Sequence, residues 1–437
     1  MTLAFPAAHE AARPHVHRVD DAVSLCLAAL NFYPVYAGPA IRFHRYLPAF
    51  ASYGVSAHVF AGTPELIKAE ASGVKRDWGE WEYGRVLAAT EPNGAALYQT
   101  RLPDTNKRRR SKIFAKALVE HCRRPETHPD VVQLLDSGPL WTIPLLKLRR
   151  LDVSVVYTAT MLPDLGNVSA VRAAVIQRKI AFSMRPMDAV VVSSGVMAEQ
   201  MRQMGVRAPV HVIPNGVDTD RFRALDGGAD RRRVREELGI GHEDAMALFV
   251  GPIVPRKGID LLLEAWTRLC KELPRLHLVL AGPRLDITHP ANRSFHQEVC
   301  RMVKESAAPK RVHFTGMIEN VEEYMRAADV FVFPSRREGM PNVVPEAMAS
   351  GLPVVMTPFI GLPSEFGEAG VHYRLVDFDA DSLADGIAEV LGDREPRGAM
   401  SSAGRSWTRQ HLGLERSVER YAELYRHLAH QRSAESR

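Results

Sequence analysis

The sequence contains few cysteines and little net charge, and both shortages exclude classes of protein. Four cysteines in 437 residues, widely spaced and without a C-x-x-C pair, predict reduced cytosolic thiols rather than a disulfide framework or a zinc site. The net charge of +5 is small beside 107 charged side chains (56 plus 51). Composition therefore indicates no general binding of polyanions.

A long hydrophobic run is also missing. Residues 22–41 carry no charge, but only the first nine are consistently apolar, and Asn31 and Pro34 then break the run. It is too short to cross a bilayer and is typical of a buried strand followed by a loop. A signal peptide is the alternative, but Asp20 and Asp21 abut the apolar run, which favours a cytoplasmic protein.

What the sequence does contain is a regular alternation of buried-type strands and helical patterns. This alternation predicts an α/β protein with parallel sheets covered by helices on both faces. Eleven strands are many for one sheet, so we predict two doubly wound domains. The predicted strands are 23–30, 55–60, 131–135, 153–158, 188–193, 210–213, 246–250, 276–280, 311–314, 329–333 and 353–356; the predicted helices include 168–184, 195–204, 259–272, 294–306 and 381–392.

A turn cluster within 211–222 marks the predicted domain boundary. An apolar strand ends at Ile213, and Pro-Asn-Gly follows it. Apolar residues at helical spacing near the end of the chain predict a last helix with one buried face. The predicted parts are a mobile tail (1–19), a first domain (20–215), a second domain (216–410) and a C-terminal helix (411–437).

The segment LFVGPIVPRKGIDLLLEAW, 248–266, is the first candidate site. A strand ends at Gly251, a loop carries Arg256 and Lys257, and a helix follows. A helix start offers free backbone N–H groups and a positive dipole, and two cations beside it favour an anion site. A solvated basic loop with a turn glycine gives the same pattern, so this motif alone leaves both interpretations open.

The segment REGMPNVVPEAMASGLPVV, 337–355, places two carboxylates around another strand-to-helix connection. Glu338 lies in the loop, and Glu346 lies one turn into a helix that is predicted to start near Asn342 and Val343. The N–H groups at such a start can face a phosphate, and ligands of parallel sheets bind at the carboxyl ends of the strands. The alternative is that Glu338 caps the helix and Glu346 only complements its dipole.

Two segments of the first domain are further candidates. Gly38 lies in a loop between the first strand and a helix, where it lets backbone approach a ligand, although a simple turn glycine is the alternative. Residues 105–124 are basic with apolar side chains on one side, which predicts either contact with an anionic membrane or acidic acceptor, or a charged surface helix. No nucleic-acid motif is found.

Four segments, in this order, resemble sequence blocks of the retaining glycosyltransferases of family 4, which have the GT-B fold. They are DAVVVSSGVMAEQM, VIPNGVDTDRF, FVGPIVPRKGIDLLLEAW and VHFTGMIENVEEYMRAADVFVFPSRREGMPNVVPEAMASGLPVV. The resemblance covers most of the chain and is strongest from 188 to 356. It implies two facing Rossmann-like domains with a nucleotide-sugar between them, the donor on the second domain and most of the acceptor on the first. It also implies that the last helix crosses back onto the first domain.

The resemblance implies roles for individual residues. Gly251 and Lys257 belong to the donor-binding residues, with Lys257 at the diphosphate. Glu346 binds the ribose hydroxyls, and Glu338 contacts the donor sugar. Enzymes of this family generally need no divalent metal or cofactor, because cations and the helix dipole offset the leaving-group charge. The other implied contacts are the N–H groups of Asn342 and Val343 with the distal phosphate, Gly38 with the same phosphate, and Ile318 with the base.

Two positions depart from the family pattern. Pro252 follows Gly251 where the family usually has Arg, and Arg256 is the candidate that supplies this charge. Thr160 follows the strand at 153–158, where the family often has His. A hydroxyl at this position can still hydrogen-bond a donor sugar.

We therefore expect a retaining enzyme that moves a sugar from a nucleoside-diphosphate sugar to a hydroxyl of a glycan, lipid or small molecule. Catalysis is expected to depend on Glu338, Lys257 and Arg256, without a metal, in the cytoplasm or at the inner face of the membrane. Two alternatives are a nucleotide-sugar 2-epimerase of similar fold and a sugar-nucleotide-binding protein without turnover. Pro252 and Thr160 suggest the second of these.

Overall fold

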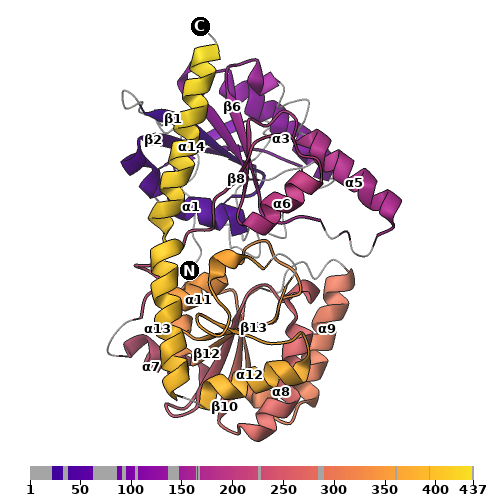
Figure 1. Cartoon of the computed structure of the whole chain (residues 1–437), viewed down its shortest axis with the longest axis vertical. Helices are drawn as coiled ribbons and strands as arrows, with labels where there is room; N and C mark the ends of the chain where they lie inside the picture. The colour runs from indigo at the N-terminus through magenta and orange to yellow at the C-terminus, as the bar shows by residue number, and fades with distance from the viewer. Residues whose placement is uncertain are drawn as a thin grey trace. The chain divides into compact units, whose positions relative to one another are not determined.

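A computed structural model describes residues 22–435, except for 33–37, 63–85, 91–94, 104–106, 136–146, 164, 166–167, 225–227, 284–289, 360–361 and 393. The predicted mobile tail at 1–19 lies outside the described residues. The chain divides into two compact units, each with its own sheet (Figure 1). Unit 1 comprises Met1–Asn215 and Glu415–Arg437, and unit 2 comprises Gly216–Leu414.

Unit 1 contains an eight-stranded sheet in the order β3-β4-β2-β1-β5-β6-β7-β8. All neighbouring strands are parallel except β3, which runs antiparallel to β4. The central strands are buried along their length, which explains their mainly apolar sequences. The strands are β1 (Val23–Ala29), β2 (Val55–Gly62), β3 (Val86–Thr90), β4 (Ala96–Thr100), β5 (Val131–Leu134), β6 (Ser154–Ala159), β7 (Ala189–Val192) and β8 (Val210–Val212); the helices are α1 (Gly38–Phe50), α3 (Lys107–Cys122), α5 (Ala170–Ser183), α6 (Gly195–Gln203) and α14 (Leu414–Glu435).

Unit 2 contains a six-stranded parallel sheet in the order β11-β10-β9-β12-β13-β14. Successive residues of β9 enter opposite cores: Leu248 packs with α7, α10 and α11, whereas Phe249 packs with α8 and α9. The strands are β9 (Ala245–Val250), β10 (Leu276–Ala281), β11 (Val312–Gly316), β12 (Val330–Phe333), β13 (Val354–Met356) and β14 (Arg374–Leu375); the helices are α7 (Ala229–Leu238), α8 (Ile259–Glu272), α9 (Pro290–Glu305), α10 (Val321–Ala327), α11 (Val343–Ala349), α12 (Ala380–Gly392) and α13 (Arg394–His411).

The last helix, α14, packs on unit 1 through buried tyrosines. The ring centroids of Tyr421 and Phe43 lie 5.2 Å apart, and the Tyr421 hydroxyl lies 3.3 Å from Thr158 Oγ1. The Tyr425 hydroxyl donates to Gln133 Oε1 at 2.9 Å. Each tyrosine therefore buries its ring while its hydroxyl keeps a polar partner, as such side chains require. No helix among the described residues is long and apolar enough to cross a membrane.

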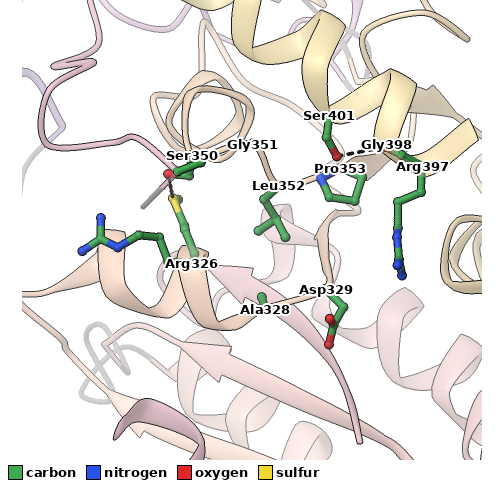
Figure 2. Close-up of a pocket in the computed structure, with 12 residues that line it drawn as sticks. Arg326, Ala328, Asp329, Ser350, Gly351, Leu352, Pro353, Arg397, Gly398 and Ser401 are labelled. Atoms are coloured by element: carbon green, nitrogen blue, oxygen red, sulfur yellow. Dashed lines mark hydrogen bonds between the residues drawn. The ribbon is translucent and has the colours of Figure 1, made fainter. Parts of the chain in front are cut away.

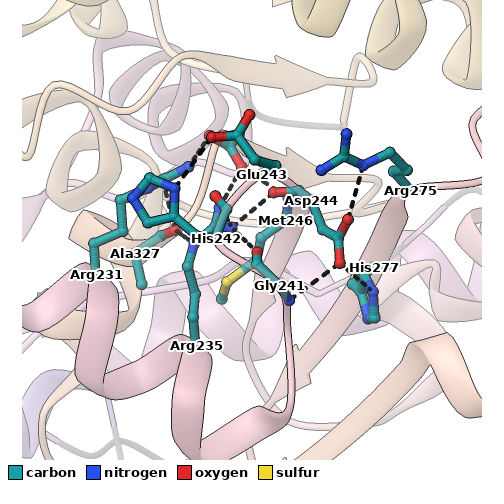
Figure 3. Close-up of polar contacts among 11 residues, drawn as sticks. Arg231, Arg235, Gly241, His242, Glu243, Asp244, Met246, Arg275, His277 and Ala327 are labelled. Carbon is teal, nitrogen blue, oxygen red and sulfur yellow. Dashed lines mark hydrogen bonds and ion pairs between the residues drawn. The ribbon is translucent and has the colours of Figure 1, made fainter.

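A buried arginine fastens α7 to the sheet of unit 2 (Figure 3). The guanidinium of Arg235 donates to Asp329 Oδ2 at 2.6 Å and to the carbonyl oxygens of Asp244 at 2.7 Å and Ala327 at 3.1 Å. Arg231 donates to the other oxygen of Asp329 at 2.8 Å. Because every contact is a charge-assisted hydrogen bond, this group fixes the start of β12, which leads into the candidate site.

The structure confirms all eleven predicted strands within two residues at each end. It adds β3, β4, β14 and α13, which the sequence analysis did not predict. β14 has two residues, which is too short for a periodic signal. Helix α13 contains Pro396, Gly398 and several serines, which lower helix propensity, but its Trp407 packs against the core of unit 2.

Within the basic segment 105–124, Lys107–Cys122 form α3, and the apolar side of this helix faces the protein. Phe114, Ala117 and Leu118 belong to the buried core of unit 1. These side chains cannot insert into a bilayer without unpacking that core. The packing favours a charged surface helix at this segment and does not support the predicted membrane contact there.

A pair of histidines is buried in the same core. The Nε2 atoms of His58 on β2 and His121 on α3 lie 3.1 Å apart. Burial lowers the pKa of His58 to about 4. Burial also lowers the pKa of His121, and the neighbouring His58 and Arg124 lower it further. Both rings are therefore neutral at pH 7, with one Nε2–H donating to the other Nε2.

Acid should destabilise unit 1 through this pair. Between a pKa of 6.5 in the unfolded chain and about 4 for folded His58, only the unfolded chain binds the proton. The free energy of unfolding therefore falls as the pH falls through this window, by up to about 1.4 kcal/mol per pH unit for each histidine. The double substitution His58→Leu with His121→Leu should flatten this dependence in urea unfolding. His242→Leu, at an exposed histidine, should keep the wild-type slope, and identical slopes for all three proteins would contradict the prediction.

Candidate functional site

The order of the strands in unit 2 locates a candidate site. The chain moves from β9 to β10 and β11 on one side, and then returns to the other side of β9 to form β12 and β13. Ligands of open parallel sheets bind at the carboxyl ends of the strands where the strand order reverses in this way. In unit 2 this point lies between the loop after β9 and the loop after β12, which contain Lys257 and Glu338 respectively.

Two glycines let the loop after β9 take its path. Gly258 precedes α8 with a φ of +69°, and a Cβ there would lie 1.8 Å from the carbonyl oxygen of Pro334. Gly251 has a φ of +154°, and a Cβ there would lie 3.5 Å from Lys257 Cε. Only glycine is accommodated at Gly258, because its backbone touches the chain that leaves β12.

Three groups converge on one oxygen of Glu338. Oε1 lies 2.6 Å from Arg256 Nη1 and 2.8 Å from Lys257 Nζ, and it accepts a hydrogen bond from Ser335 Oγ at 2.8 Å. Among the contacts of the described residues, the other oxygen, Oε2, has no partner. Lys257 and Glu338 are largely buried, with exposed side-chain fractions of 8% and 10%, whereas Arg256 is 37% exposed. The cluster is a nearly buried carboxylate between two cations.

The pKa of Lys257 is subject to opposing effects. Burial lowers the pKa of Lys257, the Glu338 carboxylate opposes this by raising it, and the Arg256 guanidinium lowers it. The ammonium group also lies 5.0 Å from the ring centroid of Phe333, within the range of a cation–π contact. Two cations and one carboxylate leave the cluster one positive charge in excess, which suits an anionic ligand.

The loop after β12 is tied directly to the loop after β9. Arg336 forms a two-pronged ion pair with Asp260 at 2.8 and 2.7 Å, and its backbone N–H donates to the carbonyl of Arg256 at 2.9 Å. Ser335 Oγ also lies 3.1 Å from the same carbonyl, so its single hydrogen is shared between this oxygen and Glu338 Oε1, which is closer at 2.8 Å. The sequence analysis did not predict roles for Ser335, Arg336 or Asp260. Their signal was present, since Ser335 and Arg336 lie two and three residues after the end of the strand predicted at 329–333.

Helix α11 begins at Val343, as predicted. Its N-cap residue is Asn342, whose side chain makes no capping hydrogen bond. Glu346 lies in its first turn and is 5% exposed. Ile318 follows β11 and packs partly against the core of unit 2. The structure thus brings Lys257, Arg256 and Glu338 into contact.

Gly38 and Thr160 belong to unit 1. Gly38 is the first residue of α1, and a Cβ there would meet no atom within 4 Å. The fold of unit 1 therefore does not require glycine at position 38, and the approach of Gly38 to a ligand stays a prediction. Thr160 directly follows β6, at the carboxyl edge of the sheet where a site is expected.

Alternating aspartates follow β14, a spacing that can hold a divalent cation. In this structure Asp379 caps α12: its two carboxylate oxygens accept hydrogen bonds from the N–H and the hydroxyl of Ser382, both at 2.8 Å. Asp381 is 87% exposed and lies beside Arg268. Because β14 is the edge strand, two places from β12, these carboxylates belong to a helix start and not to the Glu338 cluster.

One group of residues among those described has its ligand atoms close enough to hold a metal: Cys26, His58 and His121. All three are in the core of unit 1, away from the sheet edges. The Nδ1 atoms of both histidines have no hydrogen-bond partner, whereas histidine ligands usually donate their second nitrogen to an acceptor. The group is a core hydrogen-bonded pair beside a thiol and does not resemble a catalytic metal site.

A separate cavity of about 340 Å³ lies at the other edge of the unit 2 sheet (Figure 2). Asp329 and Pro353 line it and directly precede β12 and β13, so it faces the amino ends of the strands. Arg397 and Ser401 of α13 form another wall. This cavity is distinct from the Glu338 cluster at the carboxyl ends.

Comparison with known proteins identifies both halves of the chain. Residues 37–221 match the model of Glycosyltransferase Family 4, and residues 230–407 match Glycosyl transferases group 1. The lipopolysaccharide core biosynthesis mannosyltransferase LpsB of Rhizobium meliloti is 30% identical over 56% of this chain and 68% of that enzyme. A GDP-mannose-dependent α-(1-6)-phosphatidylinositol monomannoside mannosyltransferase of Mycolicibacterium smegmatis is 32% identical over 50% of this chain and 57% of that enzyme.

Solved structures share the fold. Anabaena HepE in complex with UDP and glucose superposes with a TM-score of 0.69 at 18% identity, covering 92% of this chain and 99% of that one. Sucrose-phosphate synthase from Thermosynechococcus elongatus gives a TM-score of 0.73 at 20% identity, covering 93% and 99%. Together with the two family matches and the two parallel-sheet units, these similarities show that the chain belongs to glycosyltransferase family 4 and has the GT-B fold.

Proposed function

We propose that the protein transfers a sugar from a nucleoside-diphosphate sugar to a hydroxyl acceptor with retention at the anomeric carbon. The observation that carries the proposal is the Glu338 cluster, where one carboxylate oxygen holds two cations and the other has no partner among the described residues. This arrangement suits a ligand that joins a diphosphate to a sugar. The two cations can bind the diphosphate, and the open oxygen can accept a hydrogen bond from a hydroxyl of the sugar.

The leaving diphosphate is the group that needs stabilisation. Lys257 is buried and fixed by its ion pair with Glu338, so it needs little rearrangement to meet charge that develops on a phosphate oxygen. Arg256 supplies a second cation in the loop and takes the place of the arginine that Pro252 replaces in the family pattern. Catalysis then depends on positioning and electrostatics, without a metal or cofactor.

The other contacts follow from the family pattern. Glu338 accepts a hydrogen bond from the donor sugar through Oε2, and Glu346 binds the ribose. The N–H groups of Asn342 and Val343 bind the distal phosphate. The further proposed contacts are Gly38 with that phosphate, Ile318 with the base and Thr160 with the donor sugar.

The names of the relatives suggest which donor to test first. LpsB is named a mannosyltransferase, and the mycobacterial relative is named as GDP-mannose-dependent. GDP-mannose is therefore the first candidate donor, with UDP-glucose second because HepE was solved with UDP and glucose. The relatives described above are transferases, and nothing in them supports the 2-epimerase alternative.

A donor screen tests the proposed function. The correct nucleotide-sugar should raise the melting temperature, because a ligand that binds only the folded state stabilises it by mass action. Release of nucleoside diphosphate on addition of a lipid or glycan acceptor, undiminished by EDTA, should follow with that donor. Stabilisation without any turnover would leave the binding-protein alternative, and loss of turnover in EDTA with recovery in manganese would overturn the metal-free mechanism.

Lys257→Ala should lower turnover far more than stability. Removing a preorganised cation from the leaving group should cost about 2 to 4 kcal/mol of transition-state stabilisation, or roughly 30- to 900-fold in kcat/KM. Stability should change less, because Glu338 keeps Arg256 and Ser335 as partners. Lys271→Ala, at an exposed lysine on α8, is the matched control and should keep wild-type kinetics. A Lys257→Ala enzyme with wild-type kcat/KM would show that the loop is structural.

Glu338→Gln and Glu346→Gln should have different effects on ligand affinity and on turnover. Glu346→Gln should weaken both the nucleoside diphosphate and the intact donor by roughly tenfold or more, because both contain the ribose and a charge-assisted hydrogen bond is lost. Glu338→Gln should lower turnover but keep or increase diphosphate affinity, because it frees Lys257 and Arg256 from their carboxylate.

Calorimetry with the diphosphate and with the donor separates these outcomes, and melting temperatures control for general damage. Equal losses of diphosphate affinity in the two variants would overturn the proposed division between ribose and sugar. Lower melting temperatures in both variants, with no difference between diphosphate and donor, would indicate that the two carboxylates only support the fold.

A further inference from the structure

Helix α5 exposes apolar side chains that a folded domain usually covers. Its 14 residues include no buried residue. Val171 is 77% exposed, Val175 is 45% exposed and Phe182 is 56% exposed. The helix is held to unit 1 mainly through Ile180, which packs against the core. In Figure 1 it lies at the periphery of unit 1.

The three exposed side chains form a stripe. At about 100° per residue, Val171, Val175 and Phe182 fall within an arc of roughly 40° on the helix. Arg178 falls on one side of this arc, and Lys179 falls on the other. An exposed apolar stripe between cations is the pattern of a helix that lies in the interface of a membrane.

The charged side chains of α5 and of the cavity beside it are all cations. Helix α5 contains three cations, Arg172, Arg178 and Lys179, and no acidic residue. Arg185 and Arg207 lie beside it and line a cavity that Arg178 and Lys179 also line. Among the described residues none of these five cations is paired with a carboxylate. Such a surface attracts an anionic partner and repels a cationic one.

A cavity of about 550 Å³ opens beside this stripe, between α5 and the end of α6. Phe182 and Val175 supply apolar lining, and Arg178, Lys179 and Arg185 supply cations. The guanidinium carbon of Arg185 lies 5.4 Å from the ring centroid of Phe182, so charged and apolar groups meet at one place. A cavity lined by cations next to apolar side chains suits a molecule that has a phosphate next to a hydrocarbon chain.

We propose that α5 and its cavity form a docking surface for an anionic phospholipid bilayer, with the Val171–Val175–Phe182 stripe in the acyl boundary and the five cations at the phosphates. This replaces α3, whose apolar side is buried, as the membrane-contacting element of unit 1. A bilayer fits better than a protein partner, because the stripe is one helix wide and every charged side chain on α5 and on the cavity wall is a cation. The inference does not depend on the proposed donor chemistry.

Cosedimentation of the full chain with vesicles tests the inference. Binding to equal parts phosphatidylcholine and phosphatidylglycerol should be strong at low salt, and binding to phosphatidylcholine alone should be weak. Arg178→Glu with Lys179→Glu should reduce the binding constant by roughly tenfold or more, since each cation near an anionic surface contributes about fivefold. Lys271→Glu with Lys310→Glu, which makes the same charge change on unit 2, should reduce it much less.

A fluorescent label reports where the lipid contacts the protein. Cys26, Cys122 and Cys270 are buried and only Cys300 is exposed among the cysteines, so Val175→Cys in a Cys300→Ser background carries one environment-sensitive dye. Its emission should rise and shift to the blue with anionic vesicles. Val371→Cys in the same background, at a site that is 43% exposed, should not respond.

Three results would overturn the inference. They are the absence of binding to anionic vesicles, equal binding by the α5 and control charge variants, and a dye at position 175 that does not respond to bound lipid. A change in oligomeric state or in melting temperature on substitution of Phe182 by Ser, without a change in vesicle binding, would instead assign the stripe to a protein contact. Because no readout is catalytic, failure here is distinct from failure of the proposed transfer reaction.

Discussion

The ion pair between Lys257 and Glu338 joins the two loops on which the candidate site depends. Each loop leaves a different strand, β9 or β12, and the two strands are neighbours only because the strand order reverses between them. Burial lowers the pKa of Lys257 and the Glu338 carboxylate raises it, so Glu338 stabilises the charged lysine when no anionic ligand is bound. The remaining contacts, from Arg336 with Asp260 to Gly258 against Pro334, hold the loops at the distance this pair needs.

In the proposed function, one carboxylate both holds the cations and contacts the donor sugar. Oε1 of Glu338 is occupied by Arg256, Lys257 and Ser335, which fixes the direction of the whole side chain and leaves Oε2 pointing elsewhere. A phosphate that binds the cations competes with Oε1 and not with Oε2. In the proposed reaction a donor phosphate takes the place of Oε1 beside the two cations, whose charge the single carboxylate offsets only in part before the donor binds.

The rest of unit 2 supports the same edge. Arg235 and Arg231 fix Asp329 at the start of β12, and alternate residues of β9 enter the two cores on either side of the sheet. Unit 1 repeats the architecture with different charges: its core contains a neutral histidine pair, and its helix α5 presents cations and apolar side chains to solvent. The two units therefore share a fold but expose different chemistry.

The sequence by itself determined the strands, most helices and the residue types at the site, because apolar runs and strand-to-helix loops are local patterns. It did not determine that Glu338 pairs with Lys257, since 81 positions separate them and only the β9–β12 pairing brings them together. The tertiary structure also decided which amphipathic helix is exposed. Helices α3 and α5 both carry cations and apolar residues, but α3 turns its apolar side into the core and α5 does not. Burial depends on what the rest of the chain places beside a helix, and no local pattern contains that information.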